Sequence, residues 1–450
     1  MGLIGPLGLG RRDVVAVVGA GGKTSLVYAL AAEARSRGWR VLVTTTTHMG
    51  TLPQSVTGPT FVQADGEPLE GLAAALDSHG VATVLGRRLR PDKLQGIPPE
   101  QVDRLAPLAD LTLVEADGAR GRSLKAPAEH EPVLPATTSL LVALLGLDAL
   151  GAALGPERVH RVEQVAALTG RAPGDTLGEA DLAACLAAAG SYPSRLARPA
   201  RTVAFLNKAE DTTSLAAAER IARLLIPPYD AVVAGSARAG RARAVSPAAA
   251  VVLAAGESRR MGRPKLCLPL AGGTLLGAAV APLLEAGLDP VVVVLGSRAD
   301  ELRRTGGLPA AAALRIVSHA GWGEGMASSL RRGLEECSGA GAVVVALADQ
   351  AGVSAARVAR LVEAWRAGAP LAVPVHAGRA SHPVVFDRSL WPELRRLTGD
   401  VGAREVVRAH QAEAALLECE PLRDVDTPAD YEGLRLGLPP RDDDGLPLLS

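Results

Sequence analysis

The second half of the chain holds a turn of small residues that is followed at once by basic residues. The turn ends an apolar run, and Arg259 and Lys265 come after it. Backbone N–H groups in such a turn can approach a triphosphate closely, and neighbouring cations offset the phosphate charge. We therefore predict that Arg259 and Lys265 are catalytic residues acting on the phosphates of a nucleotide. The predicted nucleotide-binding residues of the turn are Leu253, Ala254, Ala255 and Gly256. The alternative is a tight turn with solvated basic residues.

Two aspartates later in the chain are candidate ligands of Mg²⁺. Asp349 follows the apolar run 342–348, and Asp426 lies in the sequence Asp-Val-Asp-Thr-Pro. A few carboxylates and the oxygens of a triphosphate hold this hard cation together, which suits the transfer of a nucleotidyl group. We predict Asp349 as a catalytic residue and metal ligand, and Asp426 as the second ligand. Capping of the helix that Pro428 begins explains Asp426 equally well, and Asp424 is the next candidate.

A glycine-rich loop also follows an apolar run in the first half of the chain. Such a loop offers backbone N–H groups to phosphates, a lysine to the β- and γ-phosphates and a hydroxyl to Mg²⁺. The pattern GxxxxGK[ST] places its first glycine at position 17, where Val17 stands, so this loop is a variant. We predict that it binds ATP or GTP, the alternative being a structural turn. The predicted binding residues are Gly21, Gly22, Lys23 and Thr24.

Polar residues at the ends of two further apolar runs could belong to this second site. One run ends in Glu115 and Asp117, where phosphate-loop proteins carry a carboxylate directed at Mg²⁺. The other ends in Asn207-Lys208, which is similar to the start of the guanine-reading motif NKxD. Glu210 stands at the aspartate position of that motif, so the pattern indicates little preference for GTP.

The elements that must position these residues are short apolar runs between longer segments rich in alanine, leucine and arginine. The runs lie at 14–19, 41–47, 111–118, 202–208, 250–256, 290–296 and 342–350. Continuous apolar strands alternating with helices indicate an α/β fold with buried parallel sheets, which bind ligands at the carboxyl ends of their strands. Each motif above follows such a strand end.

Two separate openings of strand, glycine turn and helix, at 14–30 and 250–284, indicate two α/β domains. The segment 236–249 between them lacks apolar periodicity, so we place the boundary there. We predict one domain over residues 10–238, with a parallel sheet and a phosphate loop, and another over residues 248–434.

The composition excludes several classes of function. Lys plus Arg and Asp plus Glu both number 48, so no global charge recruits nucleic acid or a membrane surface. The four cysteines form no CxxC pair, and no apolar run reaches the ~18 residues of a membrane helix. We expect a cytoplasmic protein that binds neither nucleic acid nor a membrane.

Six segments of the C-terminal half occur in an order that resembles one enzyme family. They are 253–265 (LAAGESRRMGRPK), 323–333 (GEGMASSLRRG), 347–350 (LADQ), 378–386 (GRASHPVVF), 398–404 (TGDVGAR) and 424–428 (DVDTP). Together they resemble MobA-like nucleotidyltransferases and, within that family, the molybdenum cofactor cytidylyltransferases. The resemblance implies a Rossmann-like domain of the nucleotide-diphospho-sugar transferase type.

The resemblance also implies a reaction, the transfer of CMP from CTP to the molybdopterin cofactor with release of pyrophosphate. A substrate phosphate is the nucleophile, so the protein supplies position and charge. Ala255 goes with the use of CTP, because a glycine there resembles the guanylyltransferase branch. Ala351 replaces the usual proline and Ser381 a frequent glycine, which affects the expected efficiency and substrate fit. His319 and His382 lie in motif segments and receive no role.

Motifs of the N-terminal half resemble a second family, the selenium-dependent hydroxylase accessory family called YqeC. The segments are 44–48 (TTTTH), 111–118 (LTLVEADG), 125–132 (KAPAEHEP) and His160-Arg161. The resemblance implies a nucleotide-binding accessory domain for maturation of a molybdenum hydroxylase, with the apoenzyme as a partner. Two rivals remain for the whole chain: a nucleotidyltransferase for another phosphorylated acceptor, and a non-catalytic cofactor-binding insertion chaperone.

Overall fold

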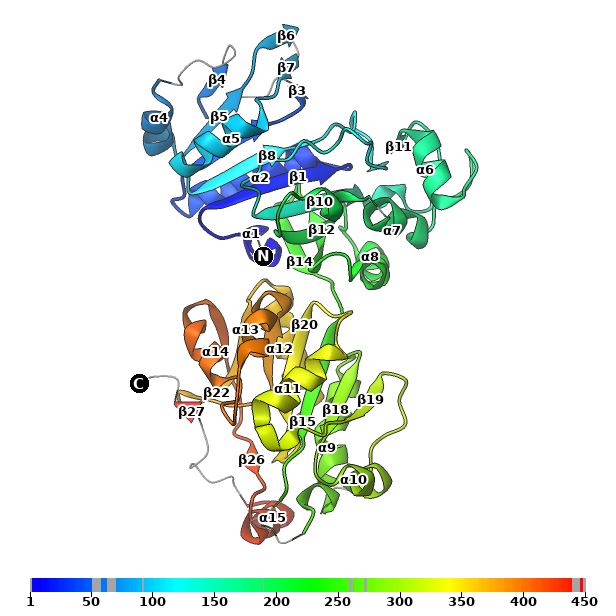
Figure 1. The fold of residues 1–450 in the computed structure, drawn as a ribbon, viewed down its shortest axis with the longest axis vertical. Coiled ribbons are helices and arrows are strands. Elements are labelled where there is room, and N and C mark those ends of the chain that lie inside the picture. The colour runs from blue at the N-terminus through cyan, green and yellow to red at the C-terminus, as the bar shows by residue number, and fades with distance from the viewer. Residues whose placement is uncertain are drawn as a thin grey trace. The chain divides into compact units, whose positions relative to one another are not determined.

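Figure 1 presents the computed structural model of the chain. The structure describes residues 2–50, 58–62, 70–90, 93–188, 190–258, 261, 263–270, 273–438 and 446–447. The chain divides into two compact units, Met1–Val245 and Ser246–Ser450. Among the described helices, none is long and apolar enough to cross a membrane.

The first unit is built around a nine-stranded sheet in the order β14-β13-β12-β10-β1-β8-β2-β5-β4. Its strands are β1 (Asp13–Gly19), β2 (Val41–Thr45), β4 (Thr60–Val62), β5 (Val81–Leu85), β8 (Leu111–Glu115), β10 (Leu140–Gly146), β12 (Arg201–Asn207), β13 (Ala231–Ser236) and β14 (Arg241–Ala244). All neighbours are parallel except β13 and β14. The central strand β1 therefore ends between the carboxyl ends of β8 and β10, where a parallel sheet binds ligands.

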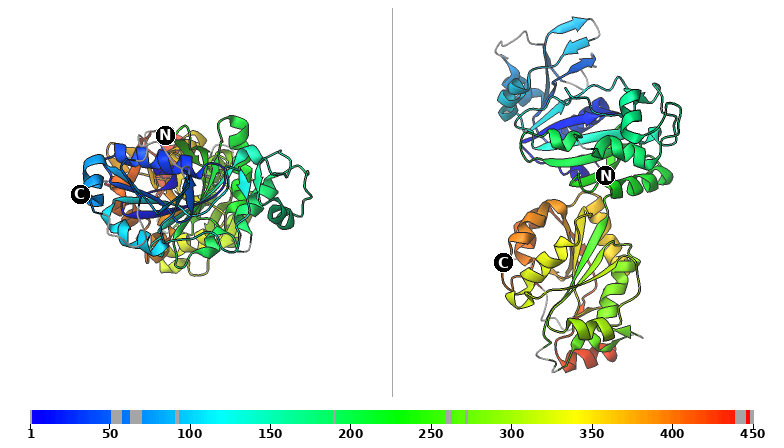
Figure 2. Two further views of the ribbon diagram at one scale, coloured as in Figure 1. Left: turned by 90° about the horizontal axis from the view of Figure 1, so that it is seen from above. Right: turned by 45° about the vertical axis from the view of Figure 1, so that its right-hand side comes forward.

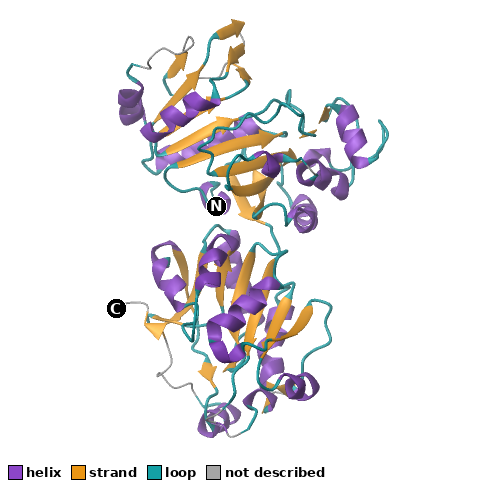
Figure 3. Ribbon diagram, viewed as in Figure 1, coloured by secondary structure: helices purple, strands orange, loops and turns teal. Residues whose placement is uncertain are grey.

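Helices cover both faces of this sheet (Figures 1 and 3). They are α1 (Ile4–Leu7), α2 (Lys23–Ser36), α4 (Leu72–His79), α5 (Pro99–Leu105), α6 (Val162–Thr169), α7 (Glu179–Ala187) and α8 (Thr212–Leu225). Alternate residues of β1 enter two different cores, because side chains of a strand alternate between its faces. Val15 and Val17 pack with α2, whereas Ala16 and Val18 belong to the core that contains residues of α7 and α8.

Short strands border the carboxyl edge of the sheet. They are β3 (His48–Gly50), β6 (Arg88–Arg90) and β7 (Lys93–Gln95), and the parallel pair β9 (Leu124–Lys125) and β11 (Val159–His160).

The second unit holds a mixed sheet in the order β19-β18-β15-β20-β24-β22-β23-β27, with β25 beside β22. The strands are β15 (Ala248–Ala254), β18 (Val291–Leu295), β19 (Leu314–Ser318), β20 (Ala342–Leu347), β22 (Leu371–His376), β23 (Arg379–Ala380), β24 (Val384–Asp387), β25 (Ala414–Glu418) and β27 (Leu446–Pro447). Strands β19, β18, β15 and β20 are parallel, and β24 is antiparallel to β20. Two short pairs lie outside this sheet, β16 (Pro269–Leu270) with β17 (Gly273–Thr274) and β21 (Gln350–Ala351) with β26 (Arg423–Asp424).

Helices lie on both sides of the second sheet as well (Figures 2 and 3). They are α9 (Leu275–Glu285), α10 (Ala299–Thr305), α11 (Met326–Glu335), α12 (Ala355–Arg366), α13 (Trp391–Arg396), α14 (Arg404–Ala409) and α15 (Pro428–Arg435). Leu330 of α11, Leu394 of α13 and Val406 of α14 join Val251 and Val294 of the sheet in one core. Helices α9 and α12 contact β15 and β22 respectively.

The predicted α/β class is confirmed in both units, with a mostly parallel sheet in the first and, in the second, four parallel strands that continue into antiparallel ones. The segment 236–249, interpreted above as lacking periodicity, nevertheless contains strand β14. Ala242 and Ala244 are buried while Arg241 is exposed, so small residues alternate with arginines and the apolar pattern is hard to detect.

Candidate functional site

Two carboxylates and one ammonium group meet at the carboxyl end of the second sheet. Lys265 Nζ lies 2.7 Å from Asp349 Oδ2 and 2.8 Å from Asp426 Oδ1. The lysine side chain is 12% exposed and the carboxylates are 29% and 28% exposed. Burial lowers the pKa of Lys265, but the two carboxylates outweigh burial and the net pKa is raised. Lys265 is therefore charged at neutral pH, and its ammonium group lies between two carboxylates.

A short backbone ladder fixes the two aspartates relative to each other. Gln350 of β21 pairs with Asp424 of β26, and the Val425 N–H donates to the Asp349 carbonyl at 3.0 Å. Asp349 and Asp426 therefore flank one pair of hydrogen-bonded strands, although 77 positions apart in the chain.

Neither aspartate caps a helix. Ser354 caps α12 through its hydroxyl, which accepts from Arg357 N. Thr427 caps α15 by accepting from Asp430 N, so the capping explanation of Asp426 is wrong. Neither carboxylate therefore serves as a helix cap, and both face the Lys265 ammonium group.

The small-residue turn lies beside these carboxylates. Strand β15 ends at Ala254, and Ser258 takes a left-handed backbone conformation with φ 57°. The Lys265 N–H donates to Ser258 Oγ at 3.3 Å, which holds the end of the loop against its start. A cavity of about 150 Å³ is lined by Leu253, Ala254, Gly256, Ser258, Lys265, Leu266, Ala348, Asp349 and Asp426.

One described residue of the predicted turn does not line this cavity. Ala255 is not among its lining residues, and its Cβ faces the end of β18, where a Cβ on Gly296 would lie 2.8 Å away. Arg259 lies outside the described residues.

The donor set fits Mg²⁺. Asp349 and Asp426 supply hard carboxylate oxygens that converge on one point, occupied by the Lys265 ammonium. Among the described residues, no cluster of three or more His, Cys, Asp or Glu side chains could hold a metal. A site with two carboxylates suits Mg²⁺, because this ion usually completes its octahedron with water and substrate phosphates.

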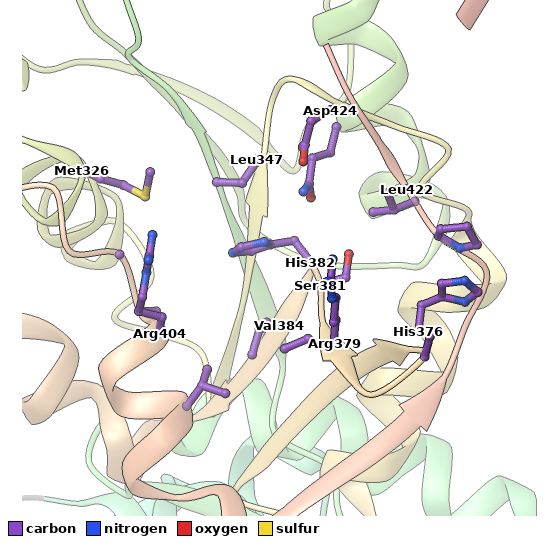
Figure 4. Close-up of a pocket in the computed structure, with 17 residues that line it drawn as sticks. Met326, Leu347, His376, Arg379, Ser381, His382, Val384, Arg404, Leu422 and Asp424 are labelled. Carbon is purple, nitrogen blue, oxygen red and sulfur yellow. The ribbon is translucent and has the colours of Figure 1, made fainter. Parts of the chain in front are cut away.

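A larger cavity of about 500 Å³ lies next to this site. Leu347, Gln350 and Asp424 line it, so it shares the β20–β21 segment and the β26 strand with the carboxylate pair. Figure 4 shows His382 between Arg404 on one side and Arg379, Ser381 and His376 on the other. Sequence reasoning assigned none of these side chains a catalytic or binding role, and the fold brings Arg404 to the stretch 376–382.

A lysine also lies between carboxylates in the first unit. Lys23 Nζ lies 3.1 Å from Asp117 Oδ1 and 4.0 Å from Glu115 Oε1, and it donates to the Gly19 carbonyl at 2.6 Å. The Thr24 hydroxyl donates to Glu115 Oε2 at 2.8 Å. The residues predicted from the glycine loop and from the end of β8 therefore meet at one edge of the sheet.

The loop backbone is partly engaged with the protein itself. Ala20 N–H donates to the Leu144 carbonyl at 2.9 Å, and Gly21 N–H donates to the Arg122 carbonyl at 2.8 Å. Gly21 has a φ of 84°, and a Cβ there would overlap the backbone nitrogen of Gly146. The close approach of β10 therefore explains this glycine. The backbone amides at the start of α2 receive no side-chain cap.

Residues of the YqeC-like motifs form one buried ionic network. Lys125 Nζ lies 2.6 Å from Asp117 Oδ2 and 2.9 Å from Glu131 Oε2, and Arg161 Nη1 lies 2.8 Å from the same Glu131 oxygen. The side chains of Lys125 and Asp117 are fully buried. Burial raises the pKa of Glu131, but hydrogen bonds from Arg161 and Lys125 prevail and lower it to about 2.

The end of β12 joins the same loop. Asn207 Nδ2 donates to the Gly21 carbonyl at 2.7 Å, and Asn207 Oδ1 accepts from Ala237 N–H at 2.9 Å. Lys208 Nζ pairs with Asp148 Oδ2 at 2.9 Å, and Glu210 Oε1 accepts from the Ser236 hydroxyl at 2.8 Å. Asn207 therefore links the loop to the end of β13.

Comparisons with known proteins agree with this division. The model of the YqeC protein family matches residues 15–163, and that of the MobA-like NTP transferase domain matches residues 250–414. Uncharacterized protein YqeC of Escherichia coli (strain K12) is 40% identical over 200 residues, which are 44% of this chain and 77% of that protein. Nicotine blue oxidoreductase of Paenarthrobacter nicotinovorans is 35% identical over 189 residues, or 39% of this chain and 91% of that protein. A probable molybdenum cofactor guanylyltransferase of Opitutus terrae is 37% identical over 122 residues, or 27% of this chain and 56% of that protein.

These matches confirm both family resemblances drawn from the motifs. The chain belongs to the YqeC family through its N-terminal unit and to the MobA-like nucleotidyltransferases through its C-terminal unit.

Proposed function

We propose that the C-terminal unit is a Mg²⁺-dependent cytidylyltransferase that transfers CMP from CTP to the molybdopterin cofactor. The observation that carries this proposal is the convergence of Asp349, Asp426 and Lys265 beside the small-residue turn. The similarity to a probable molybdenum cofactor guanylyltransferase supports the acceptor, and the fused YqeC unit supports a role in maturing a molybdenum hydroxylase.

The chemistry needs no protein nucleophile. An oxygen of the acceptor phosphate attacks the α-phosphorus of CTP, the bond from that phosphorus to the bridging oxygen breaks, and pyrophosphate leaves. Mg²⁺ held by Asp349 and Asp426 would neutralise charge on the triphosphate. Lys265 adds a positive charge close to both carboxylates, and Arg259 belongs to the same proposed set. Leu253, Ala254 and Gly256 hold the nucleotide along the cavity wall.

Selection of cytosine is assigned to the turn around Ala255. The Cβ of Ala255 faces Gly296 at the end of β18, so the turn and that strand end share one tightly packed edge. A substitution at Ala255 or Gly296 would alter the space between the turn and the end of β18. We therefore assign the preference for CTP to this edge.

The N-terminal unit is proposed to bind ATP or GTP with Mg²⁺ through Gly21, Gly22, Lys23 and Thr24. The hydrogen bond between Thr24 and Glu115 supports this assignment, because a hydroxyl at the start of α2 and a carboxylate at the end of β8 suit a magnesium site. Phosphates would meet the uncapped start of α2, since the Ala20 and Gly21 amides are bonded to the protein. The proposed partner of this unit is a molybdenum hydroxylase apoenzyme.

The test is a transfer assay with CTP, GTP, ATP and UTP, each labelled at the α-phosphate, with Mg²⁺ and molybdopterin. We expect a labelled dinucleotide from CTP and its loss in Asp349→Asn. Labelled product only with another phosphorylated acceptor would support the first rival. Tight cofactor binding without product from any nucleotide would support a chaperone.

One relative is named as an oxidoreductase, so the oxidation of NADH and NADPH is measured alongside nucleotidyl transfer. Oxidation of NADH or NADPH that survives Asp349→Asn, without any nucleotidyl transfer, would overturn the proposal.

A further inference from the structure

One motif of the first unit has no part in the sites described above. Residues 44–48 (TTTTH) run from the end of β2 to the start of β3. Thr46, Thr47 and His48 line a cavity of about 200 Å³ at the carboxyl edge of the sheet, together with Gln95 of β7. Sites for drug-sized ligands begin at about 300 Å³, so this cavity suits a smaller molecule.

The threonines of the motif hold the turn in place. The hydroxyl groups of Thr44, Thr45 and Thr46 each donate to a backbone carbonyl, at 2.8, 2.7 and 2.7 Å respectively. The Thr45 hydroxyl also accepts from the Thr47 N–H at 3.1 Å. His48 is exposed, and its ring makes no hydrogen bond or ion pair with another described residue. His48 is therefore the side chain of the motif that is left to meet a ligand.

Another part of the wall carries an amide whose orientation is fixed. Arg87 Nε donates to Gln95 Oε1 at 3.0 Å. Because arginine only donates, this bond identifies the amide oxygen and leaves the NH₂ group of Gln95 to donate elsewhere. Neither that NH₂ group nor the terminal nitrogens of Arg87 make a hydrogen bond with another described residue. Both side chains therefore keep unused donors.

Strand pairing brings these groups together. Strands β3, β7 and β6 form a small sheet (Figure 1), in which His48 and Gln95 are opposite partners of the antiparallel pair β3–β7. Opposite residues project to the same face, with Cβ atoms about 5 Å apart. A Cβ at Gly96 would lie 2.4 Å from the Thr45 carbonyl oxygen, so β7 ends tightly against the threonine turn. His48, the Gln95 amide and Arg87 therefore form one cluster of nitrogen groups.

The charge of this cluster is positive. Arg87 is exposed, and none of the described residues that line the cavity is acidic. Arg88 and Arg90 follow in β6 and are exposed as well. A guanidinium fork and an amide donor match the oxygens of a carboxylate or a phosphate. The chemistry of the wall therefore favours an oxyanion.

The cavity adjoins the end of β8 without using the glycine loop. Thr45 lies opposite Glu115 in the parallel pair β2–β8, and the Thr46 N–H donates to the Glu115 carbonyl at 3.2 Å. Neighbouring strands are about 4.8 Å apart. A ligand against Thr46 and Thr47 is therefore one strand away from Glu115, on the side opposite the strand β1 that leads into the glycine loop.

We propose that this cavity binds a small molecule through its carboxylate or phosphate group, with Arg87 and the Gln95 amide donating to the oxyanion and His48 in contact with the ligand. The inference goes beyond the proposed nucleotide site of this unit and does not depend on it, because the two sites share no side chain.

The test measures the accessibility of His48. Diethyl pyrocarbonate acylates exposed histidine rings, and tandem mass spectrometry gives the modified fraction of each histidine. The full chain is treated with glycerol 3-phosphate or succinate, and with their uncharged counterparts glycerol and succinamide. An anionic probe at ten times its Kd should slow the reaction of His48 about tenfold, because only about a tenth of the sites stay free. His79, exposed on α4 and outside the cavity, is the internal control.

Arg87→Gln tests the cation. It should raise the probe concentration for half-protection about tenfold, the scale of a charge-assisted hydrogen bond. Arg90→Gln is the matched control, because it makes the same change of charge in β6 at a residue that does not contact Gln95.

Gln95→Glu tests the amide. A carboxylate still accepts from Arg87, so the unfolding temperature should stay the same or rise, but a negative charge in the wall repels an anion and protection of His48 should be lost. A purely structural role for Gln95 predicts unchanged protection in this variant.

Protection by either anionic probe supports the site, and protection by one alone identifies the ligand group as phosphate or carboxylate. No protection in the wild type, or equal protection in Arg87→Gln and Gln95→Glu, would overturn the proposal. Calorimetric titration with ATP and GTP separates it from the proposed function. Nucleotide binding with an unprotected His48 would remove the cavity site and leave the nucleotide site, whereas a protected His48 without nucleotide binding would do the reverse.

Discussion

At the scale of residues, both units place a lysine between carboxylates, but the carboxylates of the two sites differ in their exposure to solvent. The side chains of Asp349 and Asp426 are 29% and 28% exposed, so a metal and a triphosphate can reach them. Asp117 is 0% exposed and already contacts both Lys23 and Lys125, so it serves the fold. Of the two acidic residues at the end of β8, Glu115 is the one left for a ligand, since its side chain is 13% exposed.

The first prediction concerns Asp349. Asp349→Asn removes a charge at the centre of the transfer site, and we expect turnover to fall by at least about a hundredfold because charge stabilisation dominates such reactions. The folding of the unit should persist, since Asp349 caps no helix. Pyrophosphate release is the measurement, with Asp300→Asn on the exposed face of α10 as the control. Near-normal release by Asp349→Asn would remove this residue from the mechanism.

The second prediction concerns base selection at Ala255. Ala255→Gly removes one methyl group, so the preference for CTP over GTP in kcat/KM should fall by about tenfold or less. Gly296→Ala is the companion variant, because its new Cβ would overlap the Ala255 carbonyl. It should displace the turn and raise the KM of every nucleotide. An unchanged ratio in Ala255→Gly would assign base selection to other residues.

At the scale of elements, the positions of the strands could be predicted from the sequence more fully than the pairing between them. The seven apolar runs all form strands, because residues buried on both faces leave continuous apolar stretches. The two-residue pair β21–β26 was beyond prediction, since each strand is too short for a periodic signal. That pair positions Asp349 against Asp426, so the residues of the site could be chosen from the sequence while their geometry could not.

The contacts of the glycine loop were also missed, because they join residues that are far apart in the chain. Gly21 was interpreted through phosphate binding, whereas its space is limited by Gly146 of β10, which is distant in the chain. Lys125, Glu131 and Arg161 were quoted as motif residues without a role, because their network depends on the packing of β9, β11 and a loop. Ser381 has no positive φ, so a side chain causes no backbone strain at this position.

The third prediction concerns the pH dependence of this network. The pKa of Glu131 is lowered to about 2 in the folded protein, from an ordinary value of 4.5. Its stabilising contribution is therefore complete above pH 4.5 and is lost as the pH falls from there toward 2. A pKa difference of this size corresponds to about 3 kcal/mol. Glu131→Gln lacks the titrating group, so its stability deficit should be largest near pH 7 and shrink below pH 4.5.

Denaturant unfolding followed by tryptophan fluorescence measures this effect, with Trp39 reporting on the first unit and the other three tryptophans, all beyond residue 245, reporting on the second. Glu129→Gln is the control, since Glu129 is exposed. A deficit that is independent of pH would mean that Glu131 stabilises the unit by packing.

At the scale of the whole molecule, each of the two units has its own sheet and its own cores. The candidate sites lie at the carboxyl ends of two different sheets, and each contains a glycine turn, a lysine and carboxylates. The two sites act independently if neither unit supplies a reacting group to the site of the other unit. Substitutions in the glycine loop can test this independence.

The fourth prediction uses Lys23→Ala and Thr24→Val in the full chain. Loss of the Lys23 cation should weaken the binding of ATP or GTP with Mg²⁺ by about 2 kcal/mol or more, the scale of a charge-assisted hydrogen bond. Lys23→Ala also removes a partner of buried Asp117, so unfolding of the first unit is measured alongside calorimetric titration. Thr24→Val keeps that ion pair and should weaken the dependence of binding on Mg²⁺. CMP transfer by both folded variants should equal that of the wild type. Equal nucleotide affinity in all three proteins would make Gly19–Ser25 a structural turn, and loss of transfer in a folded variant would show that the two units share one reaction.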